Sequence, residues 1–306
     1  MEKGNYSSQI RFFLRGLPHV KELTIPFVLL FSLIYICTLL WNVLLYVIVK
    51  RTPSLHTPMY FFLTNLSFLD ICLSSVTLPK LLDNFISTKA ISFIGCVSQL
   101  YFFHFLASSE CFLYTVMAYD RYVAICQPLH YSTIMNWKMS TCLAFGCWLT
   151  GSLHSITHTV LTFHLSFCES TEIDYFFCDI IPVLKLACSD TTLNKTMILA
   201  NIAAISLSCF LLILISYVHI VWAIMKIRTA GGRKRAFSTC VSHVILVALF
   251  YVPCIFTYMR PDSESSKSGA VAVFYTMVTP LLNPVIYSFR NKDVKEAIGK
   301  WLRCSS

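Results

Sequence analysis

The chain has 306 residues, of which 56% are hydrophobic and only 13% are charged. Soluble domains carry about 25% charged residues, so the composition excludes an ordinary soluble protein and indicates a membrane protein. The net charge of +9 is spread over short segments beside apolar runs. There it sets the topology and meets anionic membrane lipids, and no pattern of a nucleic-acid-binding protein is found.

Seven apolar stretches follow one another along the chain. Five contain no charged residue, and two contain a single acid each, Asp70 and Glu110. A helix needs about 20 apolar residues to cross the hydrocarbon core, whereas the strands of a membrane barrel are about 10 residues of alternating polarity. We therefore predict an all-α membrane protein, a seven-transmembrane helix bundle over residues 23–290. The predicted helices cover about 23–49, 57–84, 92–126, 139–165, 194–227, 235–260 and 268–289.

The basic residues predict the orientation of the bundle. With the C-terminus inside, the inner segments hold 14 of the 24 Lys and Arg residues and only 3 of the 15 acids, as the positive-inside rule requires. We expect residues 1–22 to be an extracellular N-terminus, with Asn5 as a glycosylation site and the first helix as an uncleaved anchor. Residues 291–306 are expected to form a cytoplasmic amphipathic helix and tail, where Cys304 is either palmitoylated or a free thiol.

Four cysteines fall on the predicted outer face, which is an oxidising environment. Cys96 begins the third helix, and Cys168, Cys178 and Cys188 lie in the long loop before the fifth. Two disulfide bonds can form among them, but the spacing alone leaves the pairing open.

Several polar residues and prolines lie inside the predicted helices. Asp70 and Glu110 are costly in lipid unless they face the bundle interior. With Asn42 and Asn283 they are expected to form a hydrated cluster that binds a sodium ion, or a structural network without an ion. Pro284, like Pro253 in the sixth helix, interrupts the backbone ladder and makes either a hinge or a static kink. No other cofactor is indicated, and the absence of hydrolase, metalloprotease and phosphate-loop motifs argues against an enzyme.

Five motifs then occur in a fixed order: PMYFFLTNLSFLD at 58–70, MAYDRYVAIC at 117–126, SY at 216–217, RAFSTCVSH at 235–243 and PLLNPVIYSFRN at 280–291. Because it carries these five motifs in this order, the chain resembles an odorant receptor of the class II, tetrapod-type group within the rhodopsin-like G-protein-coupled receptors. The resemblance covers nearly the whole chain. One departure is Trp41, since such receptors usually have Gly before the Asn of the first helix, and a large ring changes a close helix contact.

The resemblance implies two disulfides, Cys96–Cys178 and Cys168–Cys188, and an intracellular switch. In the switch, Asp120 restrains Arg121 until activation frees the guanidinium to meet the G protein. The foot of the sixth helix reads Arg-Lys-Arg at 233–235, so it offers Arg121 no second acid. The other expected switch residues are Tyr122, Tyr217, His243, Asn283, Pro284 and Tyr287.

The resemblance also implies a ligand pocket in the outer half of the bundle. Its expected lining is Phe103, His104, Ala107, Ser108, Asn201, Ile202, Tyr251, Tyr258 and Thr276, although each of these also suits ordinary helix packing. The third helix has no acid near Phe103 and the seventh has no Lys, which argues against an amine receptor or an opsin. His104, His154 and His158 are interpreted as structural histidines rather than metal ligands.

The implied function is that of an odorant receptor. The ligand is expected to be a small, volatile, mostly apolar molecule held by one or two hydrogen bonds. The partner is expected to be a heterotrimeric stimulatory G protein that raises cAMP, and the location the plasma membrane of olfactory neuron cilia. The alternatives are a non-olfactory chemosensory receptor and an ion-coupled transporter or channel. A transporter predicts inverted repeats or a continuous polar lining, and neither is found.

Overall fold

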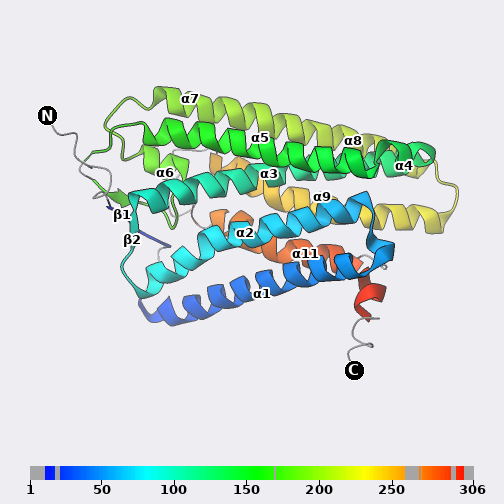
Figure 1. Ribbon diagram of the computed structural model, residues 1–306, viewed down its shortest axis with the longest axis horizontal. Coiled ribbons are helices and arrows are strands. Elements are labelled where there is room, and N and C mark those ends of the chain that lie inside the picture. Colours follow the sequence, from blue (N-terminus) through cyan, green and yellow to red (C-terminus); the bar gives the residue numbers. More distant parts are fainter. Residues whose placement is uncertain are drawn as a thin grey trace.

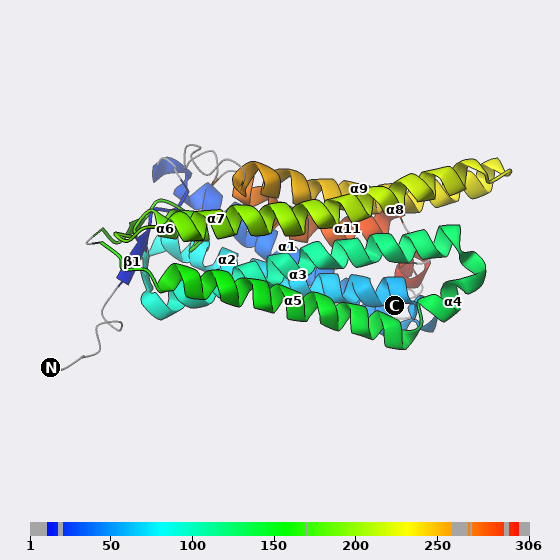
Figure 2. The same ribbon diagram turned by 90° about the horizontal axis from the view of Figure 1, so that it is seen from above.

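The computed structural model describes residues 11–17, 21–168, 170–258, 269, 271–290 and 294–299. Within these ranges, seven long helical stretches lie side by side as a bundle (Figures 1 and 2), which confirms the predicted fold class. They are α1 (Thr24–Arg51), α2 (Pro58–Ile86), α3 (Phe93–Cys126), α5 (Trp137–Phe163), α7 with η5 and α8 (Thr192–Asn201, Ile202–Ser206 and Leu207–Met225), α9 (Ala230–Tyr258), and η6 with α11 (Phe274–Val278 and Thr279–Arg290).

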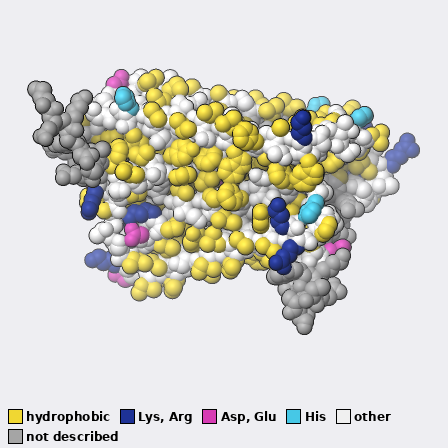
Figure 3. Space-filling model, viewed as in Figure 1, with side chains coloured by type: hydrophobic (Ala, Val, Ile, Leu, Met, Phe, Trp, Pro, Cys, Tyr) yellow, Lys and Arg dark blue, Asp and Glu magenta, His cyan; other side chains and the backbone are white. Residues whose placement is uncertain are grey.

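The outside of the bundle is covered by apolar side chains, and the two acids of the predicted spans lie in its interior. Leu29, Leu33 and Leu40 of α1 are mostly exposed, whereas Asp70 and Glu110 are fully buried. On the face shown in Figure 3, hydrophobic side chains cover the middle, while Lys and Arg lie toward the two ends. This is the distribution that a lipid environment requires. Among the described residues, three stretches are apolar and long enough to qualify as spans on composition alone: Lys21–Arg51, Pro58–Ile86 and Thr192–Met225.

The fifth and seventh helical stretches are not regular α-helices throughout. The segments η5 and η6 are π-helical, and no pattern in the sequence indicates either of them. A π-helical turn inserts one extra residue and is frequent at functional sites because it re-aims the neighbouring side chains. The sixth helix also differs from the expectation, since α9 begins at Ala230 rather than at 235.

The contact between α3 and α5 depends on one glycine. A Cβ atom on Gly151 would lie 2.9 Å from the backbone nitrogen of Ser109 and 3.0 Å from the carbonyl oxygen of Phe105. Real Cβ atoms do not approach backbone atoms so closely, so this position must be a glycine, which has no side chain. On the same helix, Gly146 has nothing within 4 Å of such a Cβ.

One end of the bundle, called the outer end here after the predicted orientation, carries a small sheet that the sequence did not predict. Its strands are β1 (Arg11–Leu14), β2 (Ala90–Ser92) and β3 (Glu172–Ile173), in the order β2-β1-β3. The N-terminal strand therefore lies between two loops. Both disulfides implied by the resemblance are present, with Cα–Cα distances of 5.4 Å for Cys96–Cys178 and 5.2 Å for Cys168–Cys188.

The opposite end carries short helical turns. After α3 come η4 (Pro128–His130) and α4 (Tyr131–Ile134), and residues 294–299 after α11 are helical. In that last helix Val294 and Ala297 are buried while Lys295 and Glu296 are exposed, the alternation of an amphipathic helix. Asn5 and Cys304 lie outside the described residues.

Candidate functional site: an outer cavity, a buried polar cluster and an inner switch

A cavity of about 90 Å³ opens within the outer half of the bundle. Its walls come from α3, α5, α7, α9 and both π-helical segments, and the short loop helix α6 (Ile180–Leu184) contributes Ile180. The lining is Phe103, His104, Ala107, Ser108, Cys111, His154, His158, Ile180, Ile198, Asn201, Ile205, Ser206, Phe250, Tyr251, Cys254, Ile255 and Tyr275. Most of these side chains are apolar, as in pockets for small organic ligands.

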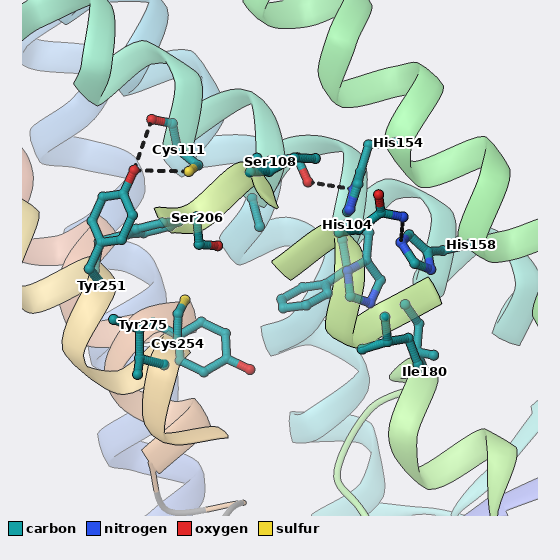
Figure 4. A pocket seen from close by; sticks show the side chains of 17 residues that line it. His104, Ser108, Cys111, His154, His158, Ile180, Ser206, Tyr251, Cys254 and Tyr275 are labelled. Carbon is teal, nitrogen blue, oxygen red and sulfur yellow. Dashed lines mark hydrogen bonds between the residues drawn. The ribbon is translucent and has the colours of Figure 1, made fainter. Parts of the chain in front are cut away.

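One side of the cavity carries paired polar groups. A hydrogen bond of 2.9 Å joins Ser108 Oγ to His154 Nδ1, and Asn201 Nδ2 donates to His158 Nε2 over 3.0 Å. His104 Nε2 donates to Asp179 Oδ1 over 2.9 Å. In Figure 4 the side chains of Ser108 and His154 point toward one another across the space between α3 and α5. These groups give the cavity a polar strip that runs from α3 through α5 to α7.

The floor of the cavity is a contact between α3 and α9. The hydroxyl of Tyr251 lies 3.0 Å from Cys111 Sγ and donates to the Cys111 carbonyl oxygen over 3.4 Å (Figure 4). The Tyr251 ring packs against Phe250, with 5.4 Å between the ring centroids. A ligand above this floor therefore touches a side chain that ties the sixth helix to the third.

The nine expected ligand residues divide into three groups. Six line the cavity: Phe103, His104, Ala107, Ser108, Asn201 and Tyr251. Thr276 is buried away from the lining, where its hydroxyl donates to the Ala272 carbonyl oxygen over 2.7 Å. The side chains of Ile202 and Tyr258 lie outside the described part of the chain. A role for each residue in ligand binding stays a prediction.

The fourth transmembrane helix, α5, forms part of the cavity wall, but none of the nine predicted ligand residues lies on it. His154 and His158 line the cavity, and their rings pack with centroids 4.6 Å apart. The available signal was their spacing of four residues, which places both on one face of a helix in which Lys138, at its start, is the single Asp, Glu, Lys or Arg residue. Ile180 was also missed, because a loop position cannot be placed over a cavity from the order of residues alone.

Asp70, Glu110 and Asn283 meet in the middle of the bundle. Asn283 Nδ2 donates to the two Asp70 carboxylate oxygens over 2.9 and 3.0 Å. The hydroxyl of Tyr114 donates to Glu110 Oε1 over 2.9 Å. Asn42 lies nearby on α1 and donates to the Pro280 carbonyl oxygen over 3.0 Å. Three of the four predicted members, Asp70, Glu110 and Asn283, are thus brought together, and the fourth, Asn42, ties α1 to α11 beside them.

The cluster leaves polar oxygens without a partner. Glu110 Oε2 and Asn42 Oδ1 are buried and accept no hydrogen bond from the described residues, and the two carboxyl groups form no ion pair in the same part of the molecule. Carboxylate and amide oxygens of this kind suit a hard cation such as sodium. Among the described residues, no group of three or more His, Cys, Asp or Glu side chains is arranged to hold a metal ion, so amide or hydroxyl oxygens would have to complete the shell.

At the inner end of α3, Asp120 is hydrogen-bonded to Tyr131, which is not among the predicted switch residues. The hydroxyl of Tyr131 in α4 donates to Asp120 Oδ1 over 2.9 Å, and Asp120 is 1% exposed. No ion pair joins Asp120 to Arg121 in the described residues, and Arg121 Nε is buried without a hydrogen-bond partner. The restraint of Arg121 by Asp120 stays a prediction, and Tyr131 adds a direct partner for the carboxylate.

The other switch residues lie on α3, α8, α9 and α11. Tyr217 OH lies 2.8 Å from His243 Nδ1, and His243 Nε2 lies 3.1 Å from the Tyr114 carbonyl oxygen, so His243 links α9 to α8 and α3. Tyr287 is buried, and its hydroxyl has no hydrogen-bond partner within the described ranges. Tyr122 packs on the ring of His219, with centroids 5.8 Å apart. Pro284 lies inside α11, one residue after Asn283.

The amino-acid sequence is similar to those of known proteins. The sequence profile of a family described as "Olfactory receptor" matches residues 31–304. The human protein Olfactory receptor 10G4 is 52% identical over 97% of this chain and 96% of its own length. Human Olfactory receptor 10G2 is 54% identical over 94% of each chain, and mouse Olfactory receptor 4E2 is 51% identical over 96% of each.

Proposed function

The chain belongs to the olfactory receptor family, whose members are multi-pass membrane proteins that bind odorants, couple to G proteins and are not enzymes, and we propose that it binds its odorant in the outer cavity and signals through a stimulatory G protein that raises cAMP. The observation that carries the ligand site is the polar strip on one side of an otherwise apolar cavity. A small molecule fits such a wall with one hydrogen-bonding group and one apolar face.

The route from the cavity to the G protein runs through α9. A ligand above Tyr251 acts on the contact between Tyr251 and Cys111, and eight residues earlier on α9 His243 links Tyr217 to α3. Pro253 lies inside this helix, and a proline kink lets the two ends of a helix move separately. We propose that this motion releases His243 and exposes Arg121 to the G protein.

The proposed orientation places the N-terminus outside and the C-terminus in the cytoplasm. Its support is the excess of Lys and Arg at the inner end, together with two disulfides at the outer end, where the environment is oxidising. The proposed location is the plasma membrane of olfactory neuron cilia.

We also propose that Asp70 and Glu110 share a sodium ion, which neutralises two buried carboxylates. An ion bound to the folded protein raises its stability in proportion to RT ln(1 + [L]/Kd). The purified receptor is therefore expected to melt at a higher temperature in sodium chloride than in choline chloride. The difference should vanish in Asp70→Asn, and equal melting temperatures of the unmodified receptor in both salts would contradict the proposal.

The experiment that tests the function is a panel of volatile ligands applied to cells that carry a cAMP reporter. At least one small, mostly apolar compound is expected to raise cAMP in a dose-dependent way. The matched control is Arg121→Ala at equal surface expression, which should keep odorant binding and lose the cAMP response. An odorant that binds the receptor but leaves cAMP unchanged in the unmodified protein would refute the coupling.

A further inference from the structure

The N-terminal strand β1 is the central strand of the outer sheet, and its backbone is bonded to two different loops. Leu14 N donates to the Lys89 carbonyl oxygen over 2.8 Å. On the other side, Phe13 N, Arg15 N and Gly16 N donate over 2.9, 2.9 and 3.0 Å to carbonyl oxygens of the loop before α6. Four consecutive amides are thus bonded outside the strand itself, which is an unusual degree of attachment for a terminal segment.

The side chains of β1 alternate between two faces. Phe12 and Leu14 are fully buried, whereas Phe13 is 46% exposed. The Phe12 ring lies 5.7 Å from the ring of Phe167 and 6.2 Å from that of Phe93, measured between centroids. The inner face of the strand is therefore packed into an aromatic cluster over the ends of the third helix and the loop.

The loop segment bonded to β1 is also the roof of the cavity. This roof segment, residues 172–180, begins with β3 and ends with Ile180, which lines the cavity. In between, the ring of Phe177 packs on Phe103 of the cavity wall at 4.6 Å, and Cys178 N donates to Gln99 Oε1 over 2.9 Å. One end of the roof segment is thus fastened to α3, and the other end is fastened to β1.

The chain just after β1 reaches a third part of the bundle. A Cβ on Gly269 would lie 3.7 Å from Leu17 Cδ2 and 4.0 Å from the Tyr175 ring, so Leu17 and the roof segment meet beside the start of the last helix. An ion pair of 3.1 Å between Arg15 and Asp174 adds a second side-chain link between strand and roof, although exposed pairs contribute little.

We propose that Phe12 and Leu14 are positioning residues for ligand binding, which hold the roof segment in the position that completes the odorant cavity. This inference rests on the proposed function of that cavity. Neither side chain lines the cavity, so both act through the roof. When β1 undocks, only a fraction of receptors keeps a binding-competent roof, and the apparent dissociation constant rises by the reciprocal of that fraction.

The test compares Phe12→Ala with Phe13→Ala, because the two variants make the same chemical change on opposite faces of one strand. At matched surface expression, Phe12→Ala is expected to raise the odorant EC50 roughly 10-fold, which corresponds to a competent fraction of about one tenth. The maximal cAMP response should be kept, because the inner switch is untouched. Phe13→Ala should leave both quantities unchanged. Phe12→Leu, which keeps an apolar side chain, should recover most of the potency.

A cross-link and a ligand-free measurement separate positioning from folding. Phe13 is paired with Ala90 across the sheet, so a Phe13→Cys/Ala90→Cys disulfide in the Phe12→Ala background should restore the EC50, while Phe13→Cys alone should not. In the purified receptor without odorant, hydrogen exchange of the roof segment should be faster in Phe12→Ala than in Phe13→Ala.

The outcomes are distinguishable from failure of the proposed function. Faster exchange of the roof segment with an unchanged EC50 would overturn the inference, as would a lowered maximal response with an unchanged EC50. Equal exchange in the two alanine variants would also overturn it. A receptor that responds to no odorant would refute the proposed function instead, while the exchange comparison would still decide whether β1 holds the roof.

Discussion

Replacing Tyr131 by Phe should raise the basal activity of the receptor. The change removes one hydroxyl, which donates over 2.9 Å to the carboxylate of Asp120, a residue that is 1% exposed. Hydrogen bonds to charged groups contribute about 1.5–3 kcal/mol, and about 1.4 kcal/mol corresponds to a factor of ten. If the bond exists only in the resting form, its loss lowers the ratio of resting to active receptors roughly 10- to 100-fold.

The assay is ligand-free cAMP accumulation at matched surface expression. An active population of about 0.1%, at the low end for a minor state, would rise to about 1–10%. The control is Tyr119→Phe, since Tyr119 is 41% exposed and its hydroxyl makes no hydrogen bond among the described contacts. An unchanged basal signal in Tyr131→Phe, or an equal rise in both variants, would refute the reasoning that α4 restrains the end of α3.

Two further predictions concern α3 and α5, the helix that packs against it. Asp120→Asn should also raise basal cAMP, because it removes the negative charge beside Arg121, and a baseline equal to that of the unmodified receptor would contradict the proposed restraint. Gly151→Val should lower the melting temperature of the purified receptor, because overpacking costs about 1–3 kcal/mol and the new side chain meets the Ser109 backbone. Gly146→Val, which faces open space, should melt like the unmodified receptor, and equal losses in both would refute the close contact.

The helices were predictable because the lipid imposes one simple rule. A span needs about 20 apolar residues whose backbone groups bond within the segment, and among the described residues each of the seven predicted runs contains a long helical stretch. The buried acids were predictable for the same reason, since Asp70 and Glu110 are too costly to face lipid. The motif-based resemblance supplied the disulfide pairing, which the spacing of Cys168, Cys178 and Cys188 left open.

Features that depend on contacts between distant segments were not predictable. A short strand such as β1 gains its stability from two loops that lie far along the chain, so its four residues carry no sufficient local signal. The π-helical segments change which side chains face the cavity without leaving a pattern in the sequence. In the sequence, nothing distinguishes His158 from an ordinary core histidine, because its partner Asn201, at 3.0 Å from Nε2, lies on the distant helix α7.

The most direct test of the ligand site is the odorant dose–response of His158→Leu beside that of Thr157→Val. His158 lines the cavity, and its neighbour Thr157 lies on the exposed face of α5. With equal surface expression, the His158 variant should shift the EC50 of a hydrogen-bonding odorant by roughly 10-fold, as the loss of one hydrogen bond of about 1.5 kcal/mol predicts. The Thr157 variant should not shift it. An unchanged EC50 in His158→Leu across all active odorants would contradict the assignment of the polar strip as the odorant site.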